Sequence, residues 1–209
     1  RRVLFRSADI ARCGGTLTAV LGRSGSGKST LLNMTAGLLT PTSGRVVLDG
    51  RDIYALTDAE RSRLRNEHFG IIPQGQTALL SLTVMENILL PVAMYGEDLP
   101  ARKNRAAELL QRLGIAHLSD VYPSDLSGGE LRRLAIARAL IKEPSLIFAD
   151  EPTSDLDDEN TAIVLELLKD LAAAGAAVLL VTHETDAVSY ADRVFSMAAG
   201  RLTEEQAQR

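Results

Sequence analysis

The stretch GRSGSGKS, residues 22–29, has the residue types and the spacing of a loop that binds phosphate. Its glycines allow the backbone to turn N–H groups inward on a phosphate group. Lys28 supplies a positive charge for the β- and γ-phosphates of a nucleotide, and the Ser29 hydroxyl can ligate Mg²⁺. The residues expected to contact the nucleotide here are Gly22, Arg23, Ser24, Gly25, Ser26, Gly27, Lys28, Ser29 and Thr30. The stretch therefore predicts a nucleotide site.

Two adjacent carboxylates, Asp150 and Glu151, follow the apolar run SLIFA at residues 145–149. Successive residues of a strand point to opposite faces, but at the end of a strand the chain can turn both acids toward one site. Asp150 is expected to bind Mg²⁺, and Glu151 is expected to orient or deprotonate a water molecule. A phosphate loop together with these acids indicates nucleotide hydrolysis.

Gln74 and His183 each end another apolar run, HFGIIPQ at 68–74 and AAVLLVTH at 176–183. The Gln74 amide could contact Mg²⁺ or the attacking water, and His183 occupies the equivalent place on its own strand. On spacing alone, a structural or solvated role is more common for such residues, so the pattern leaves both roles open.

The stretch LSGGELRRLAIARAL, residues 126–140, places a Ser-Gly-Gly turn directly before an amphipathic helix. The start of a helix carries free N–H groups and partial positive charge, which favour an anion. The chain therefore holds a second helix start that could face phosphate. Arg132, Arg133 and Arg138 on this helix either steer anions or form an exposed basic face.

These residues are positioned by short β-rich runs that alternate with helical patterns at both ends of the chain. We expect strands at 16–22, 45–50, 68–74, 145–150, 176–183 and 193–202. Between residues 74 and 144 the apolar residues recur mainly at helical spacing. The pattern predicts an α/β fold with a mainly parallel sheet, a core formed by residues 1–74 and 144–209, and an inserted α-helical subdomain at 75–143.

The composition is that of an ordinary soluble globular protein: 45% hydrophobic and 24% charged residues in a chain of 209, with a net charge of −4. No basic field favours nucleic acid as a partner. The longest apolar run, residues 171–182, is shorter than the roughly 20 residues that a membrane-spanning helix needs. Any action at a membrane is therefore expected to involve a separate membrane protein.

Taken in order, GRSGSGKST, Gln74, LSGGE, LIFADE, SDLD and His183 resemble the motif set of the nucleotide-binding domain of ABC transporters, over nearly the whole chain. The resemblance implies a P-loop NTPase with a RecA-like core that hydrolyses ATP with Mg²⁺. It implies catalytic roles for Lys28, Gln74, Glu151 and His183, the last as a γ-phosphate switch. It further implies that Ser29, Gln74 and Asp150 bind the metal, and that Ser127, Gly128, Gly129, Glu130 and Asp157 belong to the ATP site.

The same resemblance explains the second helix start. In this family two domains bind head to tail, and the signature LSGGE of each caps the γ-phosphate held by the other. The implied partners are a second copy of the chain and a transmembrane permease subunit that keeps the protein at the cytoplasmic face of the membrane. The short chain, the segment at 79–96 and YPSDLSGGE are most similar to ATPases of the lipoprotein-release and macrolide-export type, which implies an amphipathic cargo such as a lipoprotein, antimicrobial peptide, drug or haem.

The chain departs from the family in one respect. The family places an aromatic residue for adenine stacking well before the phosphate loop, but only 21 residues precede Gly22, and Phe5 is too close to it. We therefore expect the adenine-stacking residue to lie N-terminal to this chain.

Other classes of nucleotide-binding protein share only part of this motif set, and a nucleotide kinase would lack the signature LSGGE. A small GTPase would carry an N-K-x-D motif, and none occurs. A DNA-repair ABC ATPase would need a long coiled coil between Gln74 and Leu126, and the 51 residues there cannot hold one. An ABC ATPase that transmits force to an envelope or cell-division complex without moving cargo stays open as an alternative.

Overall fold

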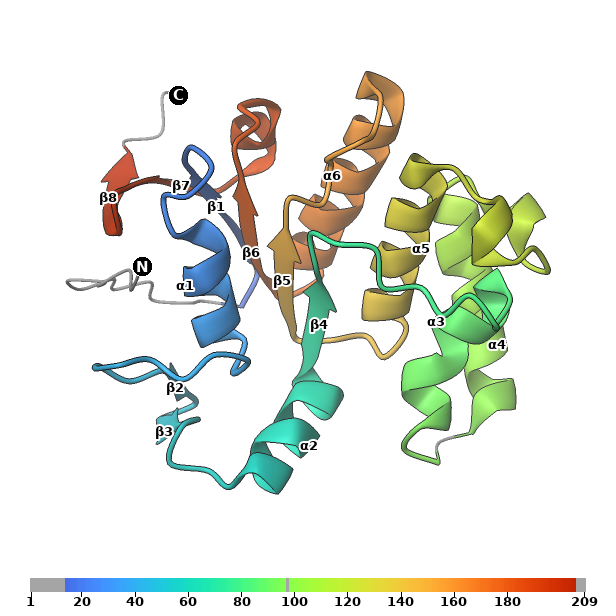
Figure 1. Cartoon of the computed structure of the whole chain (residues 1–209), viewed down its shortest axis with the longest axis horizontal. Coiled ribbons are helices and arrows are strands. Elements are labelled where there is room, and N and C mark those ends of the chain that lie inside the picture. The colour runs from blue at the N-terminus through green and yellow to red at the C-terminus, as the bar shows by residue number, and fades with distance from the viewer. Residues whose placement is uncertain (1–13, 97, 206–209) are drawn as a thin grey trace.

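The computed structural model describes residues 14–96 and 98–205, which build a six-stranded sheet in the order β4-β5-β6-β1-β7-β8 (Figure 1). The strands are β1 (Thr16–Leu21), β4 (Phe69–Ile72), β5 (Leu146–Asp150), β6 (Ala177–Thr182), β7 (Arg193–Ala198) and β8 (Arg201–Glu205). Neighbouring strands from β4 to β7 are parallel, and β8 is antiparallel to β7. The predicted α/β fold with a mainly parallel sheet is confirmed. Phe5 lies outside the described residues.

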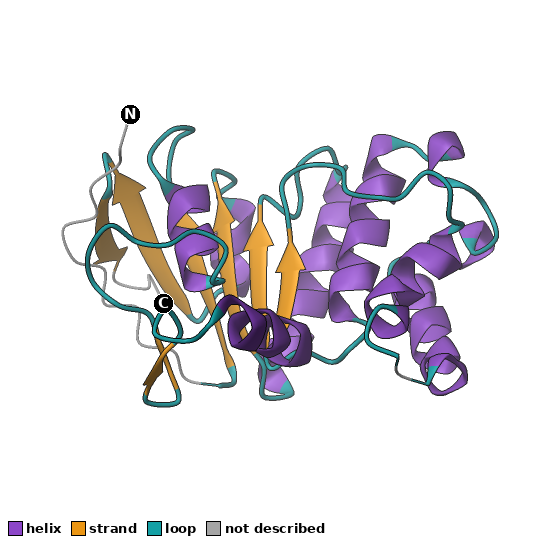
Figure 2. Ribbon diagram, turned by 60° about the horizontal axis from the view of Figure 1, so that its bottom comes forward, coloured by secondary structure: helices purple, strands orange, loops and turns teal. Residues whose placement is uncertain are grey.

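Helices connect and cover the strands. The α-helices are α1 (Lys28–Thr35), α2 (Asp58–His68), α3 (Val84–Ala93), α4 (Leu99–Arg112), α5 (Gly128–Leu140) and α6 (Asp158–Ala173). Short 3₁₀ helices lie at η1 (Ala116–Leu118), η2 (Pro123–Asp125) and η3 (Asp186–Tyr190). Figure 2 shows strands flanked by helices, with α3, α4 and α5 gathered beyond the β4 edge. In the part of the chain that the structure describes, every helix is too short or too polar to cross a bilayer.

The central strands are buried because helices cover both faces of the sheet. All residues of β5 and β6 are buried, and their side chains alternate between two hydrophobic clusters. Ile147 and Ala149 of β5 belong to the cluster that includes α3 to α6, whereas Leu146 and Phe148 belong to the cluster that includes α1. Such continuous apolar runs are typical of parallel strands in α/β proteins. The packing fixes the carboxyl ends of the strands, where the polar residues follow.

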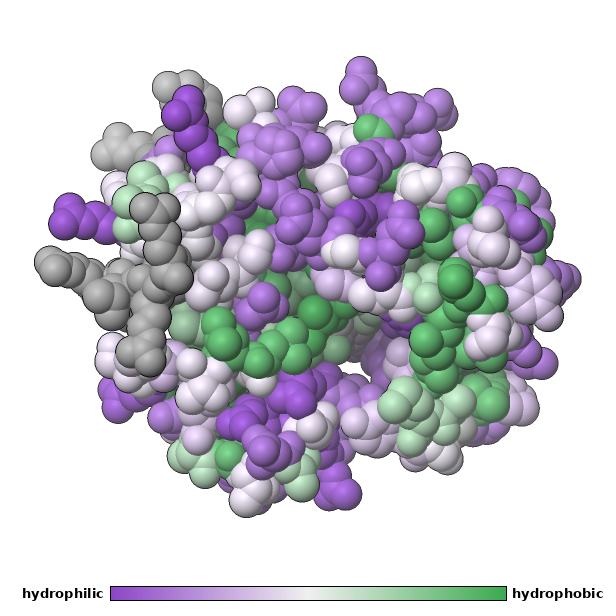
Figure 3. All heavy atoms as spheres, viewed as in Figure 1, coloured by the Kyte–Doolittle hydropathy of each residue, from purple (hydrophilic) through white to green (hydrophobic). Residues whose placement is uncertain are grey.

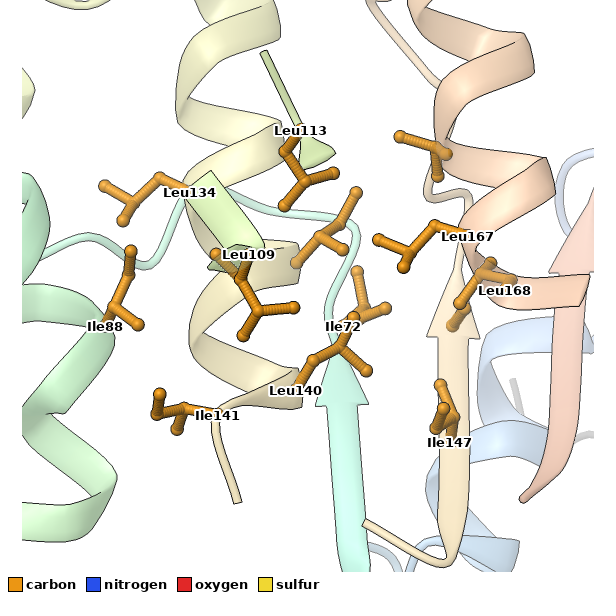
Figure 4. Close-up of a cluster of buried hydrophobic side chains, with 14 of the residues drawn as sticks. Ile72, Ile88, Leu109, Leu113, Leu134, Leu140, Ile141, Ile147, Leu167 and Leu168 are labelled. Carbon is orange, nitrogen blue, oxygen red and sulfur yellow. The ribbon is translucent and has the colours of Figure 1, made fainter. Parts of the chain in front are cut away.

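The helices between residues 75 and 143 share one hydrophobic core with the sheet. Figure 4 shows Leu140 of α5 beside Ile72 of β4, with Leu109 of α4 and Ile88 of α3 nearby and Leu167 of α6 across the cluster. The expected helical character of this stretch is confirmed, since α3, α4 and α5 lie within it. The subdomain boundaries at residues 74 and 144 stay a prediction, because the apolar side chains run on across them.

Two of the expected strands are wrong in detail. The run 193–202 is not one strand but a hairpin, in which Ala199 (φ 47°) and Gly200 (φ 76°) form the turn between β7 and β8. The run 45–50 contributes only β2 (Val47–Leu48), which pairs with β3 (Arg51–Asp52) in a separate two-stranded sheet. Its turn, Asp49 and Gly50, also has two left-handed residues. Both turns suit two-residue hairpins, because left-handed residues match the twist of antiparallel strands.

Candidate functional site

The loop between β1 and α1 depends on close packing against the β7–β8 hairpin. A Cβ added at Gly22 would lie 2.5 Å from the Met197 carbonyl oxygen, so the position needs glycine. The Ser26 carbonyl accepts a hydrogen bond of 3.0 Å from the Gly200 N–H. Gly27, with φ 109°, turns the chain into α1 in a conformation that favours glycine. The hairpin thereby braces the loop.

The start of α1 leaves donors that a phosphate group could satisfy. Gly27 gives α1 no side-chain cap, and the first N–H groups of a helix have no partner within it. The Ser26 hydroxyl is buried, and among the described residues it has no hydrogen-bond partner. A buried hydroxyl of this kind needs an explanation. A nucleotide phosphate at the helix start supplies one, so the residues present fit the predicted ligand.

Lys28 is buried and points back toward the loop. Its ammonium donates to the Gly22 carbonyl oxygen at 2.7 Å and lies 3.3 Å from Oε1 of Glu151. A buried ammonium is costly unless it is paired, and these two oxygens supply the pairing. Lys28 therefore links the phosphate loop to the acid at the end of β5.

Asp150, the last residue of β5, accepts a hydrogen bond of 3.0 Å from the Ser29 hydroxyl. Burial raises the pKa of Asp150, and the charge of Glu151 adds to the rise, while the Ser29 hydrogen bond and Lys28 oppose it. A hydroxyl and a carboxylate side by side are hard oxygen donors of the kind that Mg²⁺ binds. The pair fits the predicted metal site.

Glu151 turns toward the same site because its backbone is left-handed, with φ 48°. Its Oε2 accepts hydrogen bonds from Thr182 Oγ1 at 2.9 Å and the His183 N–H at 3.2 Å, and it lies 2.9 Å from His183 Nδ1. Burial raises the pKa of Glu151, but these hydrogen bonds together with Lys28 outweigh burial and lower it below the ordinary value. Glu151 is therefore ionised at neutral pH. The expected turning of both acids toward one site is present.

These residues meet at one cleft, here called the phosphate cleft, of about 770 Å³. It is lined by Gly22, Arg23, Ser24, Gly25, Gly27, Lys28, Ser29, Thr30, Gln74, Glu151 and His183. Ser26 and Asp150 are buried and do not line the cleft. Asp150 is connected to it through the hydrogen bond from Ser29, which is a lining residue. The structure thus brings Gln74 and His183 to the phosphate loop, although spacing left their roles open. Sequence reasoning missed Thr182, whose signal was its place one residue before His183.

The second helix start lines a different cleft, here called the signature cleft, of about 640 Å³. Its lining residues are Gln76, Ser127, Gly128, Gly129, Arg133, Asp155, Leu156, Asp157 and Asn160, none of which lines the phosphate cleft. Ser127 caps α5 by accepting from the Glu130 N–H at 3.3 Å, and the Glu130 carboxylate accepts from the Ser127 N–H at 2.7 Å. Asp157 caps α6 in a similar way. Within one chain, the two predicted phosphate sites do not meet.

The three arginines of α5 do not form an exposed basic face. Arg132 is buried, with 7% of its surface exposed, and Arg133 and Arg138 are half-buried. Arg133 donates to the Leu113 carbonyl oxygen at 3.3 Å, and Arg138 donates to the Thr77 carbonyl oxygen at 2.8 Å. The expectation of an exposed basic face was wrong because a helix pattern shows spacing along one element but not the distant carbonyl groups that meet it. Anion steering stays a prediction for Arg133, which lines the signature cleft.

A parallel sheet with a phosphate loop after β1 and a buried acid, Asp150, at the end of β5, which β6 separates from β1, defines a P-loop nucleoside triphosphatase. The family model described as "ABC transporter" matches residues 9–154. The chain therefore belongs to the ABC transporter family, as its ATP-binding and ATP-hydrolysing subunit.

Individual relatives agree with this family. The lipoprotein-releasing system ATP-binding protein LolD of Xanthomonas axonopodis pv. citri (strain 306) is 40% identical over 98% of this chain and 84% of its own. The ABC transporter ATP-binding protein YtrE of Bacillus subtilis (strain 168) is 38% identical over 95% of this chain and 87% of its own. A dimeric structure of the ATP-binding cassette MJ0796, in a post-hydrolysis state with ADP and Pi, has a TM-score of 0.91 and 32% identity, covering 98% of this chain and 91% of that one.

Proposed function

We propose that two copies of the chain bind head to tail, hydrolyse ATP in two shared sites, and drive a membrane permease that releases lipoproteins. The observation that carries the dimer is the separation of the two clefts. The phosphate loop and the start of α5 are the two parts of the proposed nucleotide site, yet they line different clefts of one chain. A second copy can bring its signature cleft to the phosphate cleft of the first, and the symmetry of such a pair completes both sites.

The phosphate cleft binds the triphosphate of ATP through the start of α1, the Ser26 hydroxyl and Lys28. Ser29, Asp150 and Gln74 would hold Mg²⁺, which when bound would supply positive charge beside the transferred phosphate. Lys28 lies 3.3 Å from Glu151 in the structure. When the phosphates attract Lys28, Glu151 loses its cation and gains negative neighbours. Both changes raise the pKa of Glu151 and make it a stronger base.

Glu151 then accepts the proton of the attacking water, while Thr182 and the His183 N–H hold its carboxylate in place. The His183 ring, 61% exposed at the side chain, reaches out from this carboxylate toward the cleft, where it can contact the γ-phosphate. Ser127, Gly128 and Gly129 of the other copy cap the same phosphate. Hydrolysis and phosphate release remove that bridge, so ATP binding closes the dimer and hydrolysis opens it.

A surface that suits the permease lies beside the loop after Gln74. Exposed apolar residues occur at Leu79 and Leu80 before α3, and at Met94 and Tyr95 after it. Figure 3 shows hydrophobic side chains gathered over this part of the molecule, with a hollow between it and a second apolar area over the segment after α1. Large exposed apolar patches mark interaction sites. A helix of the permease on its cytoplasmic side is the proposed occupant.

The loop that carries Leu79 and Leu80 is held by the fully buried side chain of Asn87. Its Oδ1 accepts from the Leu79 N–H at 2.8 Å, and its Nδ2 donates to the carbonyl oxygens of Leu79, Leu82 and Thr83 at 2.9–3.0 Å. The loop is thus preorganised for a partner. Release of lipoproteins as the work done rests on the relatives named for it.

The dimer is tested by light scattering on the Glu151→Gln variant, which should bind ATP without turning it over. We expect a monomer without nucleotide and a dimer with Mg·ATP. The matched control is Glu151→Gln combined with Ser127→Arg, which should bind ATP and stay monomeric. If titration shows saturation with ATP while the mass of Glu151→Gln remains that of a monomer, this chain alone does not form the proposed dimer.

A further inference from the structure

The guanidinium of Arg132, in the second turn of α5, contacts three segments that are distant in the sequence. Its Nη1 donates to the Pro73 carbonyl oxygen at 2.6 Å, and its Nη2 donates to the Gln74 carbonyl oxygen at 2.5 Å. Nη2 also donates to the Ser154 hydroxyl at 2.8 Å. The side chain is 7% exposed and stays protonated, because arginine does not lose its proton in proteins. A buried charge thus bridges α5 and the loops that follow β4 and β5.

One of these contacts continues to Glu151. The Ser154 hydroxyl donates to the Glu151 carbonyl oxygen at 2.9 Å, while the Glu151 N–H donates to the Val181 carbonyl oxygen at 2.8 Å. The left-handed backbone of Glu151, which points its carboxylate into the phosphate cleft, is therefore held from both sides. Arg132 reaches this backbone through a single hydroxyl group.

The other two contacts fix the backbone of Gln74, which like Glu151 and His183 lines the phosphate cleft from outside the phosphate loop and its helix. Planar guanidinium groups hold two acceptors at once in a fixed geometry, which an ammonium or an amide cannot reproduce. Arg132 lies five residues after Ser127 on the helix that begins at the signature cleft. A displacement of α5 therefore reaches Gln74 and Glu151 together.

We propose that Arg132 is a positioning residue that ties the signature helix to Gln74 and Glu151, so that closure at Ser127–Gly129 sets both cleft residues at once. The inference rests on the roles proposed above for Gln74 and Glu151. A residue that only stabilised the fold would affect nucleotide affinity, turnover and thermal stability together. A positioning residue affects turnover selectively, because binding to the phosphate loop does not depend on it.

The test compares Arg132→Gln and Arg132→Lys with wild type. Gln is too short to span both carbonyl groups, and Lys keeps the charge without the planar fork. For both variants we expect kcat to fall by about 100-fold, the effect of roughly 1 Å of misplacement at a catalytic site. The Kd for ATP, measured by titration, should stay within about threefold of wild type, because the phosphate loop is untouched.

Arg112→Gln is the matched control, since Arg112 makes a partly exposed ion pair of 2.5 Å with Asp170, and neither residue lines the phosphate cleft or the signature cleft. A partly exposed ion pair of this kind contributes little, so kcat and Kd should equal those of wild type. Wild-type kcat in Arg132→Gln, full rescue by lysine, or parallel losses in kcat, affinity and melting temperature would each overturn the proposal. Wild-type turnover by Glu151→Gln would instead overturn the base role of Glu151, which is a separate result.

Ser154→Ala distinguishes the contact of Arg132 that leads to Glu151 from its contacts with the Pro73 and Gln74 carbonyl groups. It removes the link to Glu151 but leaves both carbonyl contacts of Arg132 in place. If the link works as proposed, Ser154→Ala lowers kcat, and the double variant with Arg132→Gln is no slower than Arg132→Gln alone, because both changes break one path. If the fold-losses in kcat of the two single variants multiply in the double variant, the proposed link from Arg132 through Ser154 to Glu151 is overturned.

Discussion

Replacing Asn87 with alanine should destabilise the protein by about 3 kcal/mol, because the side chain is the hydrogen-bond partner of four backbone groups. Asn87 is fully buried on α3. It holds the loop whose Leu79 and Leu80 we propose to contact the permease. Asn87→Ala is therefore expected both to lower the free energy of unfolding and to loosen the loop that we propose to contact the permease.

The size of the stability loss depends on which hydrogen-bond partners each of the four backbone groups retains after Asn87→Ala. The Leu79 carbonyl also accepts from the Leu82 N–H, and the Thr83 carbonyl also accepts from the Asn87 N–H. For the Leu79 N–H and the Leu82 carbonyl, Asn87 is the sole partner that the described residues provide. Leaving a buried group unpaired costs about 1–3 kcal/mol, and a lost but replaceable bond costs about 0.5–1.5 kcal/mol. Water can reach the half-exposed Leu79, which keeps the sum near the lower end, about 3 kcal/mol.

Urea denaturation of Asn87→Ala against wild type measures this difference, with Asn104→Ala as the control. Asn104 is exposed on α4, so its removal should change stability by no more than about 0.5 kcal/mol. Asn87→Asp keeps an acceptor for the Leu79 N–H but turns a carboxylate oxygen toward three carbonyls, so it should be at least as destabilising as alanine. A loss below about 1 kcal/mol in Asn87→Ala would refute the reasoning, since even one unpaired group exceeds that.

Three further changes test the site. Lys28→Ala should weaken ATP binding by on the order of 100-fold in a titration, because it removes a charge-assisted contact to phosphate; near-normal ATPase activity would contradict the site. Ser127→Arg should abolish cooperative hydrolysis while leaving the ATP affinity of the monomer within about twofold, and unchanged cooperativity would argue against the trans role. Asp150→Asn should stabilise the ATP-free protein at pH 7, because burial raises the pKa of Asp150. A raised folded pKa gives stability below the unfolded pKa of about 3.9 that is lost as pH rises, so the advantage of the variant should shrink toward pH 4 in denaturation experiments. If Asp150→Asn were less stable than wild type at pH 7, the expected stabilising effect of removing the Asp150 charge would be refuted.

The parts of the site that could be predicted are those with local signals. The phosphate loop, Asp150 and Glu151 each sit where an apolar strand ends, and both the strand and the polar residues after it are visible in one short stretch. The start of α5 is equally local, since Ser127 and Glu130 cap it through bonds within four residues. Such features need no knowledge of distant segments.

The parts that could not be predicted depend on contacts across the fold. Arg132 is buried because carbonyl groups after β4 and a hydroxyl after β5 converge on it, and no pattern within α5 records them. Thr182 bonds Glu151 because β5 and β6 are neighbours, which strand spacing alone does not establish. The hairpin after Ala198 was missed because its turn, Ala199 and Gly200, lies within an otherwise strand-like run.

The position of β1 in the sheet has a consequence for synthesis of the chain. β1, which carries the phosphate loop, is paired with β6 and β7, so its partners are residues 177–182 and 193–196. Translation adds about 5–20 residues per second, so a growing chain displays the phosphate-loop sequence for on the order of ten seconds before either partner exists. During that interval the strand has no sheet to join, and the loop has no hairpin to brace it. Ribosome-bound chains that stop before residue 177 should therefore fail to retain ATP, and nucleotide capture would report that β6 and β7 have been made.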